Sequence, residues 1–274
     1  MINFNGSLFS DSDRMLISQN RAFRYGDGLF ESMRVVNGKI PFYNHHFDRL
    51  TRGMKALRIK MPSYFNPHYL KNEISKVLDN QKYCRLRLAV WREEGGLYTP
   101  TSNDPDFLIE TAPLVDKNFT LNELGMTIGL FNDFRLRETP LSAYKTSNAL
   151  PYILAALFAK ENSFEEVLML NQEGNVAEGF GSNVFFVKNK TLVTPSVSSG
   201  CVSGVMRQIV IELAQIAKID IKEMDTPLSI LRDADEVFYT NAIQGIKWVE
   251  NFEHYTYSND IAQILIDKLL ESIK

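Results

Sequence analysis

Three segments of the sequence carry residue types that together could hold a phosphorylated pyridine aldehyde. Lys145 stands between a strand-like or turn-like segment and the apolar helical run that follows Asn148. Glu178 comes later, among small residues, and residues 200–207 predict a glycine turn that opens a helix. The lysine can form a Schiff base, the acid can pair with a pyridinium nitrogen, and a helix start favours a phosphate. These parts predict a site for pyridoxal 5′-phosphate.

Each of these parts also has a plain structural interpretation. Most lysines are solvated surface charges, and Glu178 could be an ordinary turn acid. Lys145 differs because a buried helix flanks it, and burial lowers a lysine pKa enough for a neutral, nucleophilic amine. The glycines at 179 and 181 would let the backbone approach a flat ring closely. The order of the three segments therefore favours the cofactor site.

Other polar residues also have either a structural or a chemical interpretation. Arg49 is either a helix surface charge or a phosphate clamp, for which the planar guanidinium is well suited. Thr240 and Asn241 follow an apolar strand, a common position for ligand contacts. His45 and His46 are adjacent, so on a helix they point about 100° apart, and no metal site is expected. A Gly-x-Ser-x-Gly elbow is missing, which removes the serine hydrolase interpretation.

Composition sets the broad class. The chain has 274 residues, 45% hydrophobic and 23% charged, with a net charge of -3. This balance fits a globular protein of one large or two small domains, and it gives no sign of a nucleic-acid or membrane partner. The N-terminus lacks a basic region followed by an apolar core, so no secretory leader is expected. The sequence has only two cysteines, Cys84 and Cys201, which favours a reducing cytoplasm.

Hydrophobic periodicity predicts interleaved helices and strands, hence an α/β or α+β fold. Residues 34–42 predict a hairpin around Asn37-Gly38. Helices are expected at 45–59, from 67 after an Asn66 cap, at 148–161, 204–217 and from about 261. Strands are expected at 83–92, 106–112, 125–131, 166–170, 184–187, 192–193 and 236–239. A linker is expected at 112–122, which predicts domains at 1–115 and 122–274.

In this order, the segments resemble the fold type IV (class IV) aminotransferase family of pyridoxal-phosphate enzymes. The resemblance runs from residues 23–31 to residues 238–246. It implies a small N-terminal α/β domain and a larger C-terminal pseudo-barrel domain with the cofactor between them, and a homodimer. It further implies Lys145 as Schiff-base lysine and proton shuttle, and Glu178 at the pyridine nitrogen. Phosphate contacts would come from Arg49, the Val205 and Met206 backbone, Thr240 and Asn241.

Within the family, the motifs most resemble the aminodeoxychorismate lyase branch. Branched-chain aminotransferases follow the lysine with a glycine pair and Asn-Tyr, whereas here Leu150 stands where their tyrosine falls. D-amino-acid aminotransferases place a tyrosine at the Phe30 position and an Arg-x-His trap where residues 97–99 are Leu-Tyr-Thr. The spacing from Lys145 to Asn148 and Leu150 fits the lyase branch.

The resemblance therefore implies a lyase that converts 4-amino-4-deoxychorismate to 4-aminobenzoate and pyruvate in folate biosynthesis. The alternative is a class IV aminotransferase that acts on branched-chain or D-amino acids with 2-oxoglutarate. A third hypothesis is a non-catalytic protein that keeps the fold. The lyase substrate carries two carboxylates, although arginines on a sheet can as easily pair with surface acids. The candidate substrate-binding residues are Phe30, Arg34, Arg87 and Arg92.

Overall fold

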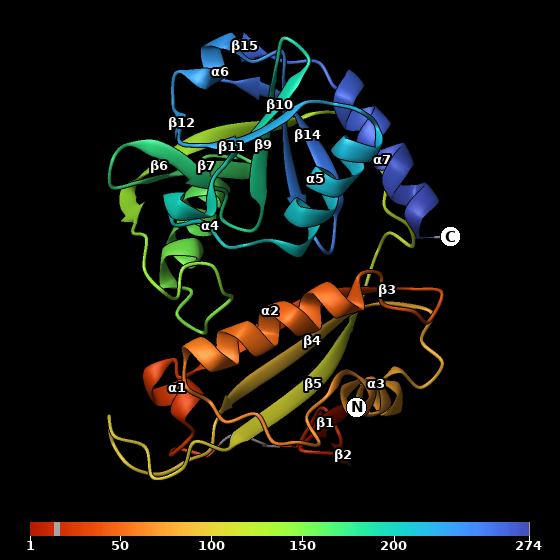
Figure 1. The fold of residues 1–274 in the computed structure, drawn as a ribbon, viewed down its shortest axis with the longest axis vertical. Helices are drawn as coiled ribbons and strands as arrows, with labels where there is room; N and C mark the ends of the chain where they lie inside the picture. The colour runs from red at the N-terminus through yellow and green to blue at the C-terminus, as the bar shows by residue number, and fades with distance from the viewer. Residues whose placement is uncertain (14–16, 274) are drawn as a thin grey trace. The chain divides into compact units, whose positions relative to one another are not determined.

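The computed structural model describes residues 1–13 and 17–273, and they form two compact units. The first unit contains residues 1–118 together with 144–148, and the second contains 119–143 together with 149–274. Each unit has its own sheet, as Figure 1 shows in red to yellow for the first and in green to blue for the second. The change of unit after Asn118 falls inside the segment that we expected to be a linker, 112–122.

The first unit is built on a five-stranded antiparallel sheet with the order β2-β1-β5-β4-β3. Its strands are β1 (Ile2–Phe4), β2 (Ser7–Phe9), β3 (Gly28–Val36), β4 (Tyr83–Arg92) and β5 (Pro105–Pro113). The even-numbered residues of β4, from Cys84 to Val90, are buried in one core with Leu29 and Met33 of β3. The alternation in β4 that the sequence predicts is therefore confirmed, and it gives the sheet one apolar face and one polar face.

Two helices cover the apolar face of this sheet. The helices of the unit are α1 (Arg21–Tyr25), α2 (Tyr43–Ala56) and α3 (Pro67–Leu78). Leu50 and Met54 of α2 and Leu70 and Ile74 of α3 belong to the same core as the sheet. Helix α3 begins as predicted, because the Asn66 side chain accepts the Tyr69 N–H at 3.0 Å and Pro67 occupies the first turn.

The predicted hairpin at 34–42 is shorter than expected. Asn37 and Gly38 both have positive φ angles, 51° and 75°, and Val36 and Lys39 exchange backbone hydrogen bonds across them. That is the two-residue turn that Asn-Gly favours. Beyond Lys39 no second strand follows, because the chain enters α2 at Tyr43.

The second unit is built on a ten-stranded mixed sheet. Its strands are β6 (Met126–Leu136), β7 (Glu166–Asn171), β8 (Asn175–Glu178), β9 (Asn183–Lys188), β10 (Thr191–Pro195), β11 (Ile221–Met224), β12 (Thr226–Pro227), β13 (Glu236–Asn241), β14 (Gly245–Phe252) and β15 (Tyr255–Thr256). The order runs from β11 at one end to β12 at the other, with β15 attached to β14. Because Asp225 alone separates β11 from β12, the sheet curls into a nearly closed barrel. The predicted pseudo-barrel is confirmed.

Helices cover the outside of this barrel-like sheet. They are α4 (Leu150–Glu161), α5 (Val205–Ile216) and α7 (Asp260–Ser272). The short helix α6 (Ile230–Asp233) instead contributes Leu231 to the core inside the sheet, and a 3-10 turn lies at Val197–Ser199. In β7, Leu168 belongs to the core inside the sheet, whereas Val167 packs with Ala155 of α4. A strand that is covered on both faces is apolar throughout, which is why β7 lacks alternation.

Among the described residues, no helix is long and apolar enough to cross a membrane. The two cysteines, Cys84 and Cys201, are both buried free thiols.

Candidate active site

Lys145 lies on a short segment that extends the sheet of the first unit. The Phe30 N–H donates to the Lys145 carbonyl, and the Ser147 N–H donates to the Gly28 carbonyl, both at 2.9 Å. Thr146 forms an isolated bridge with Leu29. Because β3 is the edge strand of this sheet, the segment uses N–H and C=O groups that an edge strand otherwise leaves unpaired. Residues 144–148 thus belong to the first unit, although we expected them within 122–274.

Two glycines make this close pairing possible. Gly26 has a φ of 64°, and a Cβ on it would lie 2.5 Å from the Asn148 side-chain oxygen. A Cβ on Gly28 would lie 2.8 Å from the Val90 carbonyl oxygen. A larger residue at Gly26 would therefore push against the lysine segment, whereas one at Gly28 would collide with β4 and also crowd the Ser147 hydroxyl at 3.3 Å. The two glycines of the Gly26-Asp27-Gly28 turn, within the segment 23–31 where the family resemblance begins, therefore have a structural role.

Lys145 and Arg87 share one aromatic neighbour on the polar face of the sheet. The pleat places Phe30 on the face opposite the core, across from Ala89 and next to Arg87. The Lys145 Nζ lies 4.8 Å from the centroid of the Phe30 ring, and the Arg87 Cζ lies 4.3 Å from it. Burial lowers the pKa of Arg87, and nearby Glu110 opposes that shift. The structure thus brings together three of the predicted residues: the lysine, Phe30 and Arg87.

Arg92, a predicted substrate residue, is committed to contacts within the first unit. It donates to both carboxylate oxygens of Asp27 and to the Leu57 and Arg58 carbonyls. Asp27 also accepts from Arg21 at 2.8 Å. Burial alone would raise the pKa of Asp27, but Arg92 and Arg21 lower it.

Arg34, the third predicted arginine, is equally buried. Its guanidinium donates to the carbonyls of Asp116 and of Asn118, the latter at 2.9 Å. Burial lowers the pKa of Arg34, which Asp116 partly offsets. Both Arg34 and Arg92 therefore hold backbone segments in place, whereas Arg87 and Lys145 each contact the Phe30 ring.

Arg49, the predicted phosphate clamp, makes a two-point ion pair with Glu31. Its Nε lies 2.8 Å from one carboxylate oxygen and its Nη2 lies 2.5 Å from the other. The His46 Nδ1 lies 2.7 Å from the same carboxylate. Burial alone would raise the pKa of Glu31, but Arg49 and the His46 hydrogen bond lower it to about 2. A role for Arg49 toward phosphate stays a prediction.

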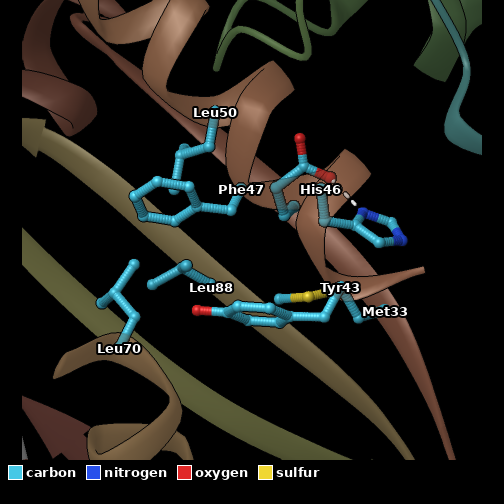
Figure 2. Close-up of a pocket in the computed structure, with 8 residues that line it drawn as sticks. Met33, Tyr43, His46, Phe47, Leu50, Leu70 and Leu88 are labelled. Carbon is cyan, nitrogen blue, oxygen red and sulfur yellow. Dashed lines mark hydrogen bonds and ion pairs between the residues drawn. The ribbon is translucent and has the colours of Figure 1, made fainter. Parts of the chain in front are cut away.

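Two members of this cluster, Glu31 and His46, also line a small apolar pocket between α2 and the sheet, and Figure 2 shows His46 at that pocket. The dashed line in the figure joins His46 to Glu31. The pocket is otherwise lined by Met33, Tyr43, Phe47, Leu50, Leu70 and Leu88. Six of its eight lining side chains are apolar or aromatic core residues, so the pocket is a packing space within the core of the first unit.

Glu178 ends β8 in the second unit and is buried, with 3% of its surface exposed. The Tyr152 hydroxyl donates to its Oε1 at 2.7 Å, and the Asn183 side-chain amide donates to its Oε2 at 3.3 Å. The Val202 N–H lies 3.1 Å from each oxygen. These donors favour the ionised carboxylate, which is the form that a pyridinium nitrogen needs. The interpretation of Glu178 as a solvated turn acid is wrong.

The predicted phosphate contacts in the second unit also fit an anion. Val205 and Met206 begin α5, whose N-cap Gly204 has no side-chain capping bond. The first N–H groups of a helix lack intrahelical acceptors, and the dipole there favours a negative charge. The Thr240 hydroxyl is buried and has no hydrogen-bond partner among the described residues. Asn241 donates to the Ser182 hydroxyl at 3.0 Å at the end of β13. A phosphate could satisfy such an orphaned hydroxyl.

Glu166, the first residue of β7, is a buried acid for which the sequence predicts no role. It is 5% exposed and accepts the N–H groups of Val167 and Phe180, at 3.1 and 2.8 Å. Burial raises its pKa to about 7 despite these hydrogen bonds. A charged residue at the start of a buried strand, Glu-Val-Leu-Met-Leu, is the one sequence signal that could have singled it out. Tyr152, Asn183 and the Val202 N–H gave no such signal.

Comparisons with known proteins identify the family of this chain. The model of the family described as amino-transferase class IV matches residues 28–252, which is most of the chain. The chain belongs to the class IV aminotransferase family. The family is one of pyridoxal-phosphate enzymes, so the chain is an enzyme of that class and pyridoxal 5′-phosphate is its cofactor. Both predictions are confirmed.

Relatives in this family carry different activities. A provisionally named branched-chain-amino-acid aminotransferase of Methanocaldococcus jannaschii is 30% identical, over 100% of this chain and 95% of the relative. The aminodeoxychorismate lyase of Bacillus subtilis is 27% identical, over 94% of this chain and 89% of the relative. The crystal structure of 4-amino-4-deoxychorismate lyase from Pseudomonas aeruginosa matches with a TM-score of 0.87 at 27% identity. The match covers 99% of this chain and 98% of that structure's chain. The family is thus established for this chain, at the level of a lyase or an aminotransferase.

Proposed function

We propose that this class IV enzyme is an aminodeoxychorismate lyase, which releases 4-aminobenzoate and pyruvate and so serves folate synthesis. The observation that carries the proposal is the motif around the lysine, Lys145-x-x-Asn148-x-Leu150. In the structure, the Asn148 side chain donates to the Gly26 carbonyl at 3.2 Å and thereby ties this motif to the Gly-Asp-Gly turn. The similarity to lyases from Bacillus subtilis and Pseudomonas aeruginosa supports the proposal.

Arg87 is the best supported candidate for a substrate carboxylate. Its side chain is 38% exposed, and its nearest acid, Glu110, is 3.7 Å away and itself 45% exposed. A weak, half-solvated ion pair of this kind costs little to exchange for a substrate carboxylate. Arg34 and Arg92 are held by backbone carbonyls, and Arg92 also by Asp27. Phe30 would give the substrate ring a flat apolar surface beside Arg87.

The proposed residues divide the reaction among them, and Lys145 has two roles. The cofactor, when bound, supplies an electron sink for the bond-breaking step. Lys145 would hold the cofactor covalently, and its Nζ, once released as a neutral amine, would take the proton from the amine-bearing carbon. Glu178 would keep the ring nitrogen protonated. Val205, Met206, Thr240, Asn241 and Arg49 would bind the phosphate. A positioned base of this kind contributes roughly 10²–10⁴-fold.

The alternative function is amino-group transfer from a branched-chain or D-amino acid to 2-oxoglutarate. The 30% identity to the relative from Methanocaldococcus jannaschii favours this candidate. The two activities share the lysine, the acid and the phosphate contacts, so the site geometry described above serves both. They differ in one requirement, because a transferase needs a keto acid to complete its cycle and a lyase does not.

The test is product formation from aminodeoxychorismate by the cofactor-loaded protein without any keto acid. We expect 4-aminobenzoate and pyruvate in equal amounts, at a rate proportional to enzyme concentration. We expect Lys145→Ala to reduce turnover to the background rate, because the covalent attachment and the base are lost together. Lys188→Ala is the matched control, since that lysine is 45% exposed and pairs with Asp233 on the surface.

Normal lyase turnover by Lys145→Ala would overturn the assigned role of this lysine. An inactive wild-type protein that shows the visible cofactor band would instead favour the transferase. A panel of L- and D-amino acids with 2-oxoglutarate would then identify the donor.

We also propose that the enzyme is a cytoplasmic homodimer. Helix α4, which its apolar sequence predicts to be buried, instead exposes a stripe of large aliphatic side chains at helical spacing. These are Leu150, Ile153, Leu154 and Leu157, each with about half or more of its surface exposed. Such a stripe is typical of a surface that another protein chain covers. The two buried free thiols favour a reducing compartment.

A further inference from the structure

We propose that Tyr152 is a positioning residue that keeps the Glu178 carboxylate ionised, and so sets how firmly the proton stays on the cofactor's ring nitrogen. This inference rests on the proposed role of Glu178 at that nitrogen. It concerns a hydroxyl on α4 that lies outside the lysine, acid and phosphate motifs.

The position of Tyr152 follows from the packing of α4. The side chains of α4 that pack toward the sheet are Tyr152, Ala155, Phe158 and Ala159. The Tyr152 hydroxyl is the one polar group among these four, and it lies 2.7 Å from the Glu178 Oε1. A hydrogen bond to an ionised acceptor at this distance is a short, strong one. The helix therefore delivers a single donor to this carboxylate.

The hydroxyl acts as a donor at all working pH values. Burial, followed by the charge of Glu178, raises the pKa of Tyr152 far above its usual range, so the phenol keeps its proton. Cys201 faces the same pair, and burial and Glu178 raise its pKa to about 12, so it stays a neutral thiol. Arg207 acts on Cys201 from α5 and is itself paired with Glu223 at 2.7 Å. The Tyr152 phenol and the Cys201 thiol therefore both stay uncharged through the neutral range.

The Tyr152 hydrogen bond affects the reaction through the proton affinity of Glu178. A hydrogen bond donated to a carboxylate stabilises its ionised form and lowers its affinity for a proton. A proton that lies between the carboxylate and the ring nitrogen then stays on the nitrogen. Removing the hydroxyl would raise the proton affinity of Glu178 and weaken the positive charge on the ring. A less positive ring is a weaker electron sink.

The experiment compares the holoenzymes of wild type, Tyr152→Phe and Tyr257→Phe. The Tyr257 hydroxyl donates to the Leu231 carbonyl at 2.9 Å and is also buried in the second unit, which makes it a matched control away from Glu178. Two quantities are measured: kcat, and the pH midpoint of the cofactor's visible absorbance band. A positive ring disfavours a second positive charge on the conjugated cofactor, so a weaker ring charge moves that midpoint upward.

For Tyr152→Phe we expect kcat to fall about tenfold and the midpoint to rise by about one pH unit, from the loss of one hydrogen bond to a charged group. Tyr257→Phe should leave the midpoint unchanged. An unchanged midpoint in Tyr152→Phe, or an equal shift in both variants, would overturn the proposal. The titration needs no lyase substrate, so the expected shift in a protein without lyase activity would support the role of Tyr152 and refute the lyase alone.

Discussion

Glu31 in the first unit and Glu166 in the second are equally hidden from solvent but differ in proton affinity. They are 2% and 5% exposed. Burial by itself raises the pKa of both carboxyls, yet the pKa of Glu31 falls to about 2 while that of Glu166 rises to about 7. Glu31 is paired with the Arg49 cation, whereas Glu166 accepts backbone N–H groups.

The difference shows that partners, and not depth, decide the charge of a buried acid. A nearby opposite charge offsets the cost of removing a carboxylate from water, and neutral donors offset it only in part. The first unit thus holds a permanent ion pair under α2. The second unit holds an acid that can gain a proton near neutral pH, beneath the loop 179–182 that follows Glu178.

Breaking the Glu31–Arg49 ion pair in the first unit should cause the largest loss of stability. Glu31→Gln leaves the buried Arg49 cation without its counter-charge, and we expect it to reduce the free energy of unfolding by about 3–5 kcal/mol. Denaturant unfolding of the cofactor-free protein at pH 7 measures this loss. Glu110→Gln, which removes a half-exposed acid near Arg87, should cost less than about 1 kcal/mol. Similar losses in both variants would contradict the contrast between buried and exposed pairs.

The pH dependence of stability should have opposite signs for the two acids. For Glu31 the folded pKa is lowered, so its contribution is present above pH 4.5 and is lost as the pH falls toward 2. For Glu166 the folded pKa is raised, so stability should fall as the pH rises from 4.5 through 7. The Glu166 contribution is about 3 kcal/mol across that window.

Unfolding of wild type and Glu166→Gln at pH 5 and pH 8.5 checks this sign. The wild type should lose more stability than the variant between the two pH values, because the variant has no proton to release. Equal changes in both proteins would show that Glu166 keeps an ordinary pKa.

The smallest expected effect concerns the loop over Glu166. A Cβ on Gly179 would lie 2.8 Å from the Glu166 carboxyl carbon and 2.8 Å from a Tyr239 ring carbon. Gly179→Ala should therefore destabilise the protein by about 1–3 kcal/mol through overpacking. Gly181→Ala is the matched control, because its Cβ would have only an ordinary 3.9 Å contact with Glu166. A larger loss for Gly181→Ala in thermal unfolding would place the tight contact elsewhere in the loop.

Much of the fold could be predicted because its signals are local. The Asn66-Pro67 helix start, the alternation in β4 and the apolar run of β7 each depend on neighbours in the sequence. Strand β14, in contrast, was not predicted. It lies inside the barrel-like sheet, between β13 and β6, and its pairing with β6 joins residues more than a hundred positions apart. Residue type alone does not report such long-range pairing.

The same distinction applies to the site. Lys145 and Glu178 could be singled out from the sequence because each belongs to a short motif: Lys145 precedes an apolar helical run, and Glu178 precedes two glycines. Tyr152 was missed because its meaning arises from where α4 packs, which brings its hydroxyl to a carboxylate 26 positions later in the chain. Arg34 and Arg92 were singled out for their charge, and only the structure shows that backbone carbonyls surround them.

Residues 144–148 belong to the first unit but are synthesised well after the rest of it, which ends at residue 118. As the chain leaves the ribosome, the edge of β3 stays uncovered until its last partner, the lysine segment, has been made. Strand β6 likewise cannot pair with β14 until residues 245–252 have been synthesised. Exposed strand edges invite pairing with other chains, so the nascent protein passes through a period in which chaperone protection matters. Translation pauses between 120 and 245 should therefore lower the yield of soluble enzyme.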